Sequence, residues 1–174
     1  MIMKAAGLAD FDRVMEFYYN LIKDMQNAEF HPGWKEDIYP TRQFIHDAIR
    51  QGELYTAVED NAIIGAMVLN HDRAEEYDKV LWKINADKDQ IAFIHALGVS
   101  ARYQSRGYGK KMVAYAIDIS KRKGLKAIRL DVLASNAPAQ KLYVSMGFLY
   151  RDTLRLFYED TGLTDFYVYE LPFE

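Results

Sequence analysis

Residues 91–111 read IAFIHALGVSARYQSRGYGKK, and this stretch decides the fold. Its first part, up to Val99, is almost entirely apolar, which is typical of a strand that is buried on both faces of a sheet. Gly107 and Gly109 follow, and a helical pattern begins with them. The stretch therefore predicts a central strand that leads through a glycine turn into a helix.

The glycine turn has the chemistry of an anion site. The first turn of a helix directs free backbone N–H groups, and the positive end of the helix dipole, at one small volume. Glycines at 107 and 109 carry no Cβ atom that would keep a pyrophosphate away from the backbone. The spacing matches neither a nucleotide P-loop nor GxGxxG. Taken alone, the turn could also be an ordinary helix start. The basic residues that surround it are Arg102, Arg106, Lys110 and Lys111.

Downstream of this stretch, strands and helices alternate. The pattern predicts a helix over 107–123 that Gly124 ends, a buried strand over 126–133, and a helix over 136–146 with Asn136 as its cap. Such a series implies parallel neighbouring strands with right-handed crossovers. Two aromatic strands follow, at about 148–158 and 164–171.

Upstream, the apolar spacing predicts two helices and a hairpin, with no strand assigned before the first helix. The helices cover about 9–27 and 41–51, and the hairpin strands lie within 54–60 and 62–70. Residues 71–90 are polar and predict a long loop or an irregular short helix. We therefore expect an α/β fold with a mixed sheet, as one domain over residues 1–174.

Composition narrows the possible functions. The chain has 174 residues, half of them hydrophobic, and no cysteine, which excludes disulfides, thiolate zinc sites and a cysteine nucleophile. Its net charge of −3 argues against nucleic-acid binding. No apolar run approaches the roughly 18 to 20 residues that span a bilayer, and no signal-peptide pattern is present. We expect a cytoplasmic protein that binds neither nucleic acid nor membrane.

A second segment, NAPAQKLYVSMGF at 136–148, gives the glycine turn a more specific meaning. It matches the pattern N-x-x-A-x-x-L-Y-x-x-x-G-F at every defined position, and residues 104–109 match Q-x-x-G-x-G. In both respects the chain resembles the GNAT acetyltransferase superfamily. It departs from the usual family pattern at Ala101, where relatives often have proline.

The resemblance implies a GNAT-like fold with a central mixed sheet of about six to seven strands and about four flanking helices. In this family acetyl-CoA lies where two parallel strands splay, here 91–99 and 126–133. Backbone amides at Leu97, Gly98 and Val99 would bind the pantetheine and polarise the thioester. The remaining residues that would bind the cofactor are Gln104, Ser105, Arg106, Gly107, Tyr108, Gly109, Lys110, Asn136 and Ala139. Asn136 could instead be a helix cap only.

The same resemblance names a base. Attack on the thioester needs a neutral amine, and a lysine-like amine has a pKa near 10.4, so a base or a water chain should remove a proton. His95 lies in a His-Ala-Leu-Gly-Val strand similar to that of the arylalkylamine acetyltransferases, in which this histidine is assigned to proton removal. Phe93 takes the place of their second histidine. The alternative is that His95 is a core residue with satisfied hydrogen bonds.

Tyr143 matches the family's general acid, which protonates the departing CoA thiolate. The alternative is that this tyrosine only packs on its helix. A GNAT-like domain that senses acyl-CoA without turnover, transfer of a longer acyl chain, and transfer to a hydroxyl group also stay open. The histidines at 31, 46 and 71 show no metal-ligand spacing, so we expect no metal.

The acceptor is expected to be an amine of a small molecule or peptide. Several aromatic residues lie in segments that line the acceptor side in relatives, although aromatic residues of this kind more often belong to the core. Several acidic residues in loops could favour a cationic acceptor, although acidic loops are more often only solvated. A homodimer through the apolar outward faces of the last strands is plausible. The aromatic residues are Trp34, Tyr39, Tyr77, Trp82, Tyr158 and Tyr167, and the acidic ones are Glu29, Glu36, Asp37, Glu75, Glu76 and Asp78.

Overall fold

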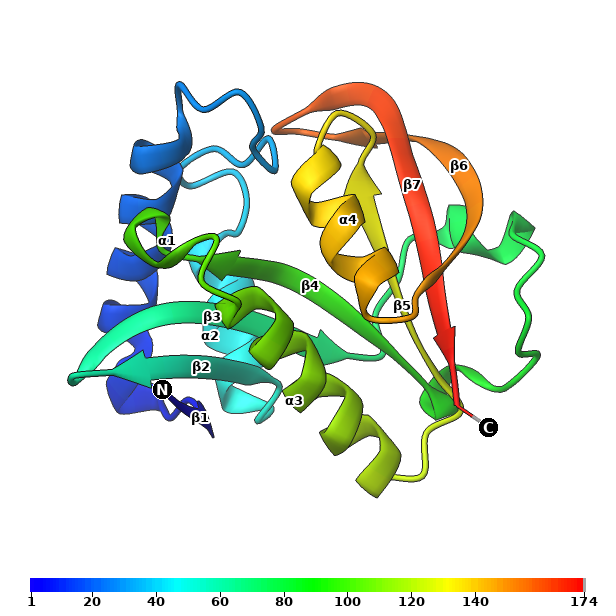
Figure 1. Ribbon diagram of the computed structural model, residues 1–174, viewed down its shortest axis with the longest axis horizontal. Helices are drawn as coiled ribbons and strands as arrows, with labels where there is room; N and C mark the ends of the chain where they lie inside the picture. Colours follow the sequence, from blue (N-terminus) through cyan, green and yellow to red (C-terminus); the bar gives the residue numbers. More distant parts are fainter. Residues whose placement is uncertain (174) are drawn as a thin grey trace.

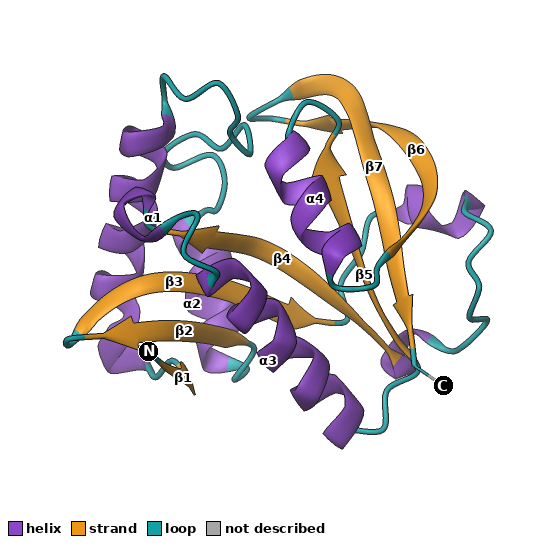
Figure 2. Cartoon of the chain, in the orientation of Figure 1, coloured by secondary structure: helices purple, strands orange, loops and turns teal. Residues whose placement is uncertain are grey.

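The computed structural model describes residues 1–173, which form one mixed sheet with helices on both faces (Figures 1 and 2). Within those residues the sheet has seven strands in the order β1-β2-β3-β4-β5-β7-β6. Its only parallel pair is β4 and β5, so the predicted mixed α/β sheet is confirmed. The strands are β1 (Ile2–Ala5), β2 (Leu54–Glu59), β3 (Ala62–Asn70), β4 (Ile91–Val99), β5 (Ala127–Leu133), β6 (Leu149–Tyr158) and β7 (Gly162–Pro172).

Four α-helices within residues 1–173 cover the sheet. They are α1 (Phe11–Met25), α2 (Arg42–Arg50), α3 (Tyr108–Arg122) and α4 (Ala137–Ser145). The alternation of side chains along β3 separates the two layers, since Met67 and Leu69 pack toward α3 while Ala66 and Val68 pack toward α1 and α2. The core therefore lies on both faces of the sheet, with α1 and α2 on one side and α3 on the other.

The first strand was missed in the sequence. β1 pairs antiparallel with β2 from Ile2↔Val58 to Ala5↔Tyr55 and forms one edge of the sheet. It spans four residues, and the side chains are mostly exposed. Such a short edge strand has neither an apolar run nor a clear alternation, so no sequence pattern distinguishes it from a loop.

β4 and β5 pair at one end only, and they diverge at the other. The parallel register covers Ile91↔Ala127, Ala92↔Ile128 and Phe93↔Arg129, and no further pair is formed by the described residues of the two strands. β4 also bulges against β3 near Ala96, whose φ of 49° is positive. The strands therefore open like a V, with α4 above the gap (Figure 1).

The polar segment 71–90 is irregular, as expected, and contains two short 3-10 turns at Glu75–Lys79 and Lys88–Gln90. A buried carboxylate ties it to the sheet. Glu170 of β7 is fully buried and accepts hydrogen bonds from Arg129 of β5 and from the backbone N–H groups of Lys83 and Ile84. Arg129 also lies over the ring of Trp82, 4.1 Å from its centroid. One buried ion pair therefore joins β5, β7 and the long loop.

The closing hairpin places β7 between β5 and β6. Apolar side chains on this hairpin remain exposed, among them Phe157 at 70% and Leu163 at 59%. Such surface is what the dimer hypothesis requires, and the dimer stays a prediction. No helix among residues 1–173 combines the length and the apolar character that crossing a bilayer requires.

Candidate active site

The gap between β4 and β5 opens into a cavity of about 420 Å³. This volume lies in the range of small-molecule sites. Its walls come from both strands, from α4, from the loop around residues 32–44 and from the turn between β6 and β7. Five of the residues predicted for the site line it: His95, Leu97, Asn136, Ala139 and Tyr143.

His95 lies in β4 just before the bulge, with its ring half-buried in the cavity wall. Nε2 is 2.9 Å from the backbone oxygen of Asp72. Because a carbonyl oxygen can only accept, this hydrogen bond places the proton of the neutral ring on Nε2 and leaves the lone pair on Nδ1. Burial lowers the pKa of His95, against a smaller opposing effect of Asp131. The ring is therefore neutral near pH 7 and has a nitrogen free to accept a proton.

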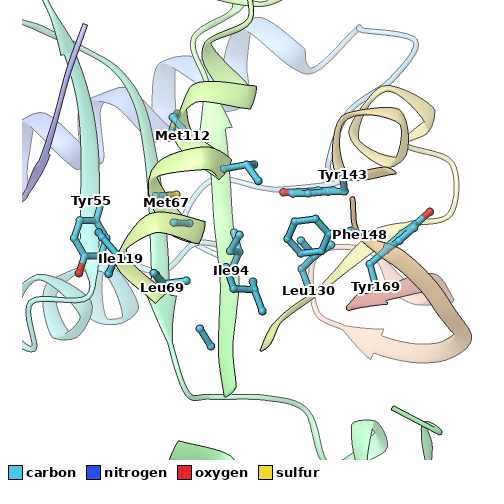
Figure 3. Packing of buried hydrophobic residues seen from close by; sticks show 14 of the residues in the cluster. Tyr55, Met67, Leu69, Ile94, Met112, Ile119, Leu130, Tyr143, Phe148 and Tyr169 are labelled. Atoms are coloured by element: carbon cyan, nitrogen blue, oxygen red, sulfur yellow. The ribbon is translucent and has the colours of Figure 1, made fainter. Parts of the chain in front are cut away.

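Tyr143 approaches the cavity from the opposite side, on α4. Its ring packs edge-on against Phe148 at 5.5 Å between centroids, and its hydroxyl points toward β4 (Figure 3). Among the described residues the hydroxyl forms no hydrogen bond. Burial, and then the charge of Asp131, raise the pKa of Tyr143, so the phenol stays protonated. A protonated, unpaired hydroxyl beside a cavity is suited to donate a proton.

Asp131 of β5 is the main site residue that the sequence analysis missed. Its carboxylate lines the cavity and accepts hydrogen bonds from the hydroxyls of Tyr77, at 2.6 Å, and Tyr158, at 3.3 Å. Burial raises the pKa of Asp131, and the hydrogen bond from Tyr77 and the charge of His95 act against this rise. The signal was an acidic residue inside the apolar run 127–133, where a strand buried on both faces has no place for a solvated charge.

The glycine turn lies at the start of α3, outside the cavity. Gly107 is the residue before the helix and has φ of 81°, and Ser105 has φ of 60°. A Cβ atom on Gly107 would meet nothing within 4 Å, so this part of the turn is open to a ligand. Gly109 has a different reason to be glycine, since its Cβ atom would lie 3.2 Å from Leu142 of α4. The first-turn N–H groups and the exposed basic side chains around them form a donor set that suits a pyrophosphate.

The other predicted cofactor residues have identifiable places. Gln104 donates from Nε2 to the backbone oxygen of Val99 at 3.0 Å, and the hydroxyl of Tyr108 donates to Glu59 at 3.0 Å. These side chains fix the turn rather than face the cavity. Arg106 and Lys110 are exposed and belong to the glycine turn and the first turn of α3. Gly98 is a packing position, because a Cβ atom there would lie 2.4 Å from Leu21.

Asn136 caps α4, since its side-chain oxygen accepts from the N–H of Ala139 at 3.4 Å. Both residues also line the cavity. The cap is therefore confirmed, while a contact of Asn136 with a cofactor stays a prediction.

The aromatic residues divide between the cavity and the core. Trp34, Tyr39 and Tyr158 line the cavity, whereas Tyr77 holds Asp131, Trp82 covers Arg129, and Tyr167 packs edge-on against Tyr150. The acidic residues expected from the loops do not line this cavity. Its acidic residues are instead Asp72, Asp131, Glu159 and Asp160.

The sequence profile of the Acetyltransferase (GNAT) family matches residues 18–148, which is three quarters of the chain. The chain belongs to the GNAT acetyltransferase family. This membership accounts for the splayed strands and the glycine turn together.

Several relatives of this GNAT acetyltransferase carry names. The [ribosomal protein bS18]-alanine N-acetyltransferase of Haemophilus ducreyi is 33% identical over 84 residues, which are 48% of this chain and 58% of that protein. The Escherichia coli K12 protein of the same name is 34% identical over 82 residues, or 47% and 55% of the two chains. The matches thus span little more than half the length of these curated relatives.

Solved GNAT structures cover nearly the whole chain. A GNAT-family acetyltransferase from Streptococcus agalactiae has a TM-score of 0.76 at 19% identity over 99% of this chain and 95% of its own. The Salmonella typhimurium protein yncA, solved with its cofactor acetyl-CoA, has a TM-score of 0.72 at 18% identity over 100% and 94%. At these identities the likeness establishes the shared fold.

Proposed function

We propose that this GNAT acetyltransferase moves the acetyl group of acetyl-CoA directly onto a primary amine. One observation carries the proposal: the divergence of β4 and β5 leaves one cavity that both His95 of β4 and Tyr143 of α4 line. One group is a neutral imidazole with a free nitrogen, and the other is a protonated phenol. A direct transfer to an amine needs one base and one acid of this kind.

Acetyl-CoA supplies the activated thioester when it is bound. The N-terminal turn of α3, with Arg106 and Lys110, would hold its pyrophosphate, and backbone N–H groups at the bulge of β4 near Leu97 would bind the thioester oxygen. The open face of Gly107 fits this assignment, because no atom of residues 1–173 lies within 4 Å of an added Cβ there.

The residues of the cavity can then account for every proton. Asp131 attracts the incoming ammonium, and Nδ1 of His95 accepts one of its protons. The neutral nitrogen attacks the thioester carbon, a C–N bond forms and the C–S bond breaks. The Tyr143 hydroxyl donates its proton to the sulfur and is reprotonated, through solvent, by the second proton that the nitrogen loses. His95 releases its proton to water.

The class of acceptor we propose is the amine of a small molecule or peptide. The relatives named as alanine N-acetyltransferases of a ribosomal protein support including peptide N-termini among the candidates.

The test is release of CoA thiol from acetyl-CoA in the presence of a panel of alkylamines, diamines, arylalkylamines, amino acids and peptides with N-terminal alanine. The proposal predicts amine-dependent release that His95→Ala and Tyr143→Phe both reduce. Binding of acetyl-CoA by calorimetry without release on any amine would identify a sensing module instead. Faster thiol release from a longer acyl-CoA would show that acetyl-CoA is not the preferred donor. Release with alcohols alone would show that the acceptor is a hydroxyl group and not an amine.

A further inference from the structure

The cavity has a second carboxylate that forms no salt bridge among the described residues. Asp160, in the turn between β6 and β7, lines the cavity and is only 7% exposed. Burial raises the pKa of Asp160. Hydrogen bonds from the backbone N–H groups of Asp160 and Thr161, and the charge of Lys35, lower it in part. Within residues 1–173, no lysine or arginine nitrogen lies within 4.0 Å of the Asp160 carboxylate. Asp160 as a residue is more than nine-tenths buried, and a carboxylate in this position is stabilised further when a ligand cation enters the cavity beside it.

One carboxylate of the cavity wall and its arginine are already paired within the chain. Asp72 pairs with Lys88 at 3.5 Å, and Arg73, the cation of the wall, pairs with Asp78. Asp131 has only the neutral hydroxyls of Tyr77 and Tyr158. Glu159, the remaining acidic residue of the wall, forms no salt bridge among the described residues either, but it is exposed to solvent. The less exposed carboxylates of the wall that lack an ion pair are therefore Asp131 and Asp160.

The two carboxylates come from different elements of the wall. Asp131 is opposite Val168 in the sheet and faces the reaction centre at His95. Asp160 is two residues beyond Tyr158, whose hydroxyl reaches Asp131 at 3.3 Å. Asp160 itself lies in the turn that follows β6. A cationic group at Asp131 and a second one at Asp160 would therefore be joined by a spacer, and a series of diamines measures its length.

The wall near these carboxylates is aromatic. Rings follow one another from Trp34 to Tyr39 at 6.1 Å, to Phe44 at 5.7 Å and to His95 at 6.4 Å. Tyr158 and Phe166 pack at 5.2 Å on the side of β6 and β7. Aromatic faces pack against methylene groups and attract ammonium groups.

We infer that the acceptor is a linear amine with a second cationic group, in which the reacting amine lies at Asp131 and His95 and the second ammonium lies at Asp160. This inference rests on the proposed function, since it names the acceptor class of the same site. The contact with Asp160 forms before any chemistry, so it acts mainly on KM.

The test compares matched pairs of acceptors: putrescine with butylamine, cadaverine with pentylamine, and hexamethylenediamine with hexylamine. In the wild type at least one diamine should exceed its monoamine in kcat/KM by roughly 10- to 100-fold, the worth of a hydrogen bond to a charged group. Asp160→Asn should abolish this preference by raising KM for the diamine, with kcat changed by less than about threefold. Asp165→Asn is the control, because it removes the same charge from the same hairpin outside the cavity.

Equal kcat/KM for diamines and monoamines would overturn the inference while the proposed function stands. So would a preference that survives Asp160→Asn, or a peptide with N-terminal alanine as the better acceptor. If no amine releases thiol, the proposed function fails, and calorimetry of putrescine still tests the site. Binding that Asp160→Asn weakens by roughly 10-fold or more, and Asp165→Asn does not, would support it. Equal binding by all three proteins would overturn it.

Discussion

Tyr143 differs from the other tyrosines of its core cluster because it lines the cavity. Tyr143 and Tyr169 belong to the same buried cluster, yet only Tyr143 lines the cavity (Figure 3). The ring contributes to packing, and the oxygen is available for chemistry. These two contributions can be separated at the scale of one residue.

Tyr143→Phe should lower kcat by about 10² to 10⁴, the usual contribution of general acid catalysis, and leave acetyl-CoA affinity nearly unchanged. Tyr143→Ala should in addition lower stability by about 3 to 5 kcal/mol, because it removes a buried ring. Steady-state kinetics and thermal unfolding of both variants measure this, with Tyr169→Phe as the matched loss of a hydroxyl. A Phe variant with the kcat of the wild type would reduce Tyr143 to a packing residue.

His95 gives a prediction about pH. The ring must be neutral to accept a proton, so kcat/KM should rise with pH through its pKa and then level off. Burial lowers that pKa from its usual value near 6.5, so the rise should be complete by neutral pH. In His95→Ala no side chain removes the proton, so the reaction depends on the fraction of acceptor that is already a neutral amine. The kcat/KM of this variant should therefore keep rising into the alkaline range.

His46→Ala is the control, since this half-exposed histidine on α2 lies outside the cavity. It should retain the wild-type pH profile. A His95→Ala profile that also coincides with the wild type would return His95 to the core.

At this scale the sequence predicted the motif residues and missed the carboxylates. His95, Leu97, Asn136, Ala139 and Tyr143 lie in recognisable patterns, and all of them line the cavity. Asp131 and Asp160 belong to no pattern. They meet the others only because β5 pairs with β7 and the turn before β7 folds back over the cavity, and local sequence does not encode such contacts.

Among the elements, α3 depends most clearly on its starting turn. Both ends of the helix carry a glycine with positive φ, 81° at Gly107 and 71° at Gly124, and neither has atoms near an added Cβ. The two positions therefore share a left-handed backbone conformation that strains any residue with a Cβ atom. They differ in that only Gly107 lies at the end where an anion would bind.

Gly107→Val and Gly124→Val should lose similar amounts of stability, about 1 to 3 kcal/mol each, since both force a β-branched residue into a left-handed conformation. Only Gly107→Val should weaken the binding of acetyl-CoA, by roughly 10-fold or more, because the valine side chain would occupy the space proposed for the pyrophosphate. Chemical denaturation and calorimetry measure the two effects. Equal affinities for acetyl-CoA in both variants would contradict the phosphate assignment.

Long periodic elements were predictable, and short ones were not. The four helices and the strands β2 to β7 agree with the expected ranges within a few residues, because each has a regular apolar pattern. β1 lacks such a pattern. The segment 71–90 owes its shape to Glu170, far along the chain, so the segment itself could not reveal its structure.

Across the whole molecule, the pair of Arg129 and Glu170 joins parts that are distant in sequence. Glu170→Gln keeps the shape of the side chain but leaves the Arg129 charge buried without its partner. Breaking a buried pair in this way should lower the free energy of unfolding by about 3 to 5 kcal/mol. Asp165→Asn breaks the exposed pair with Arg155 on the same hairpin and should cost less than about 1 kcal/mol.

Urea denaturation of the two variants makes the comparison. A Glu170→Gln protein as stable as Asp165→Asn would show that the buried pair does not hold the long loop to the sheet. In that case other contacts would have to hold Tyr77, which lies in this loop, at its hydrogen bond with Asp131.

The strand pairing of β5 also bears on how the protein folds while it is made on the ribosome. β5 is held to β4 at three positions but to β7 at seven, and β7 is the last of the described strands to leave the exit tunnel. Synthesis runs from the N-terminus, and early segments begin to fold first. A nascent chain that already carries His95, Asp131 and Tyr143 therefore lacks the strand that fixes two of them. Catalytic competence should arrive late, with residues 162–172, so that stalled or shortened chains are inactive although they contain every motif of the family.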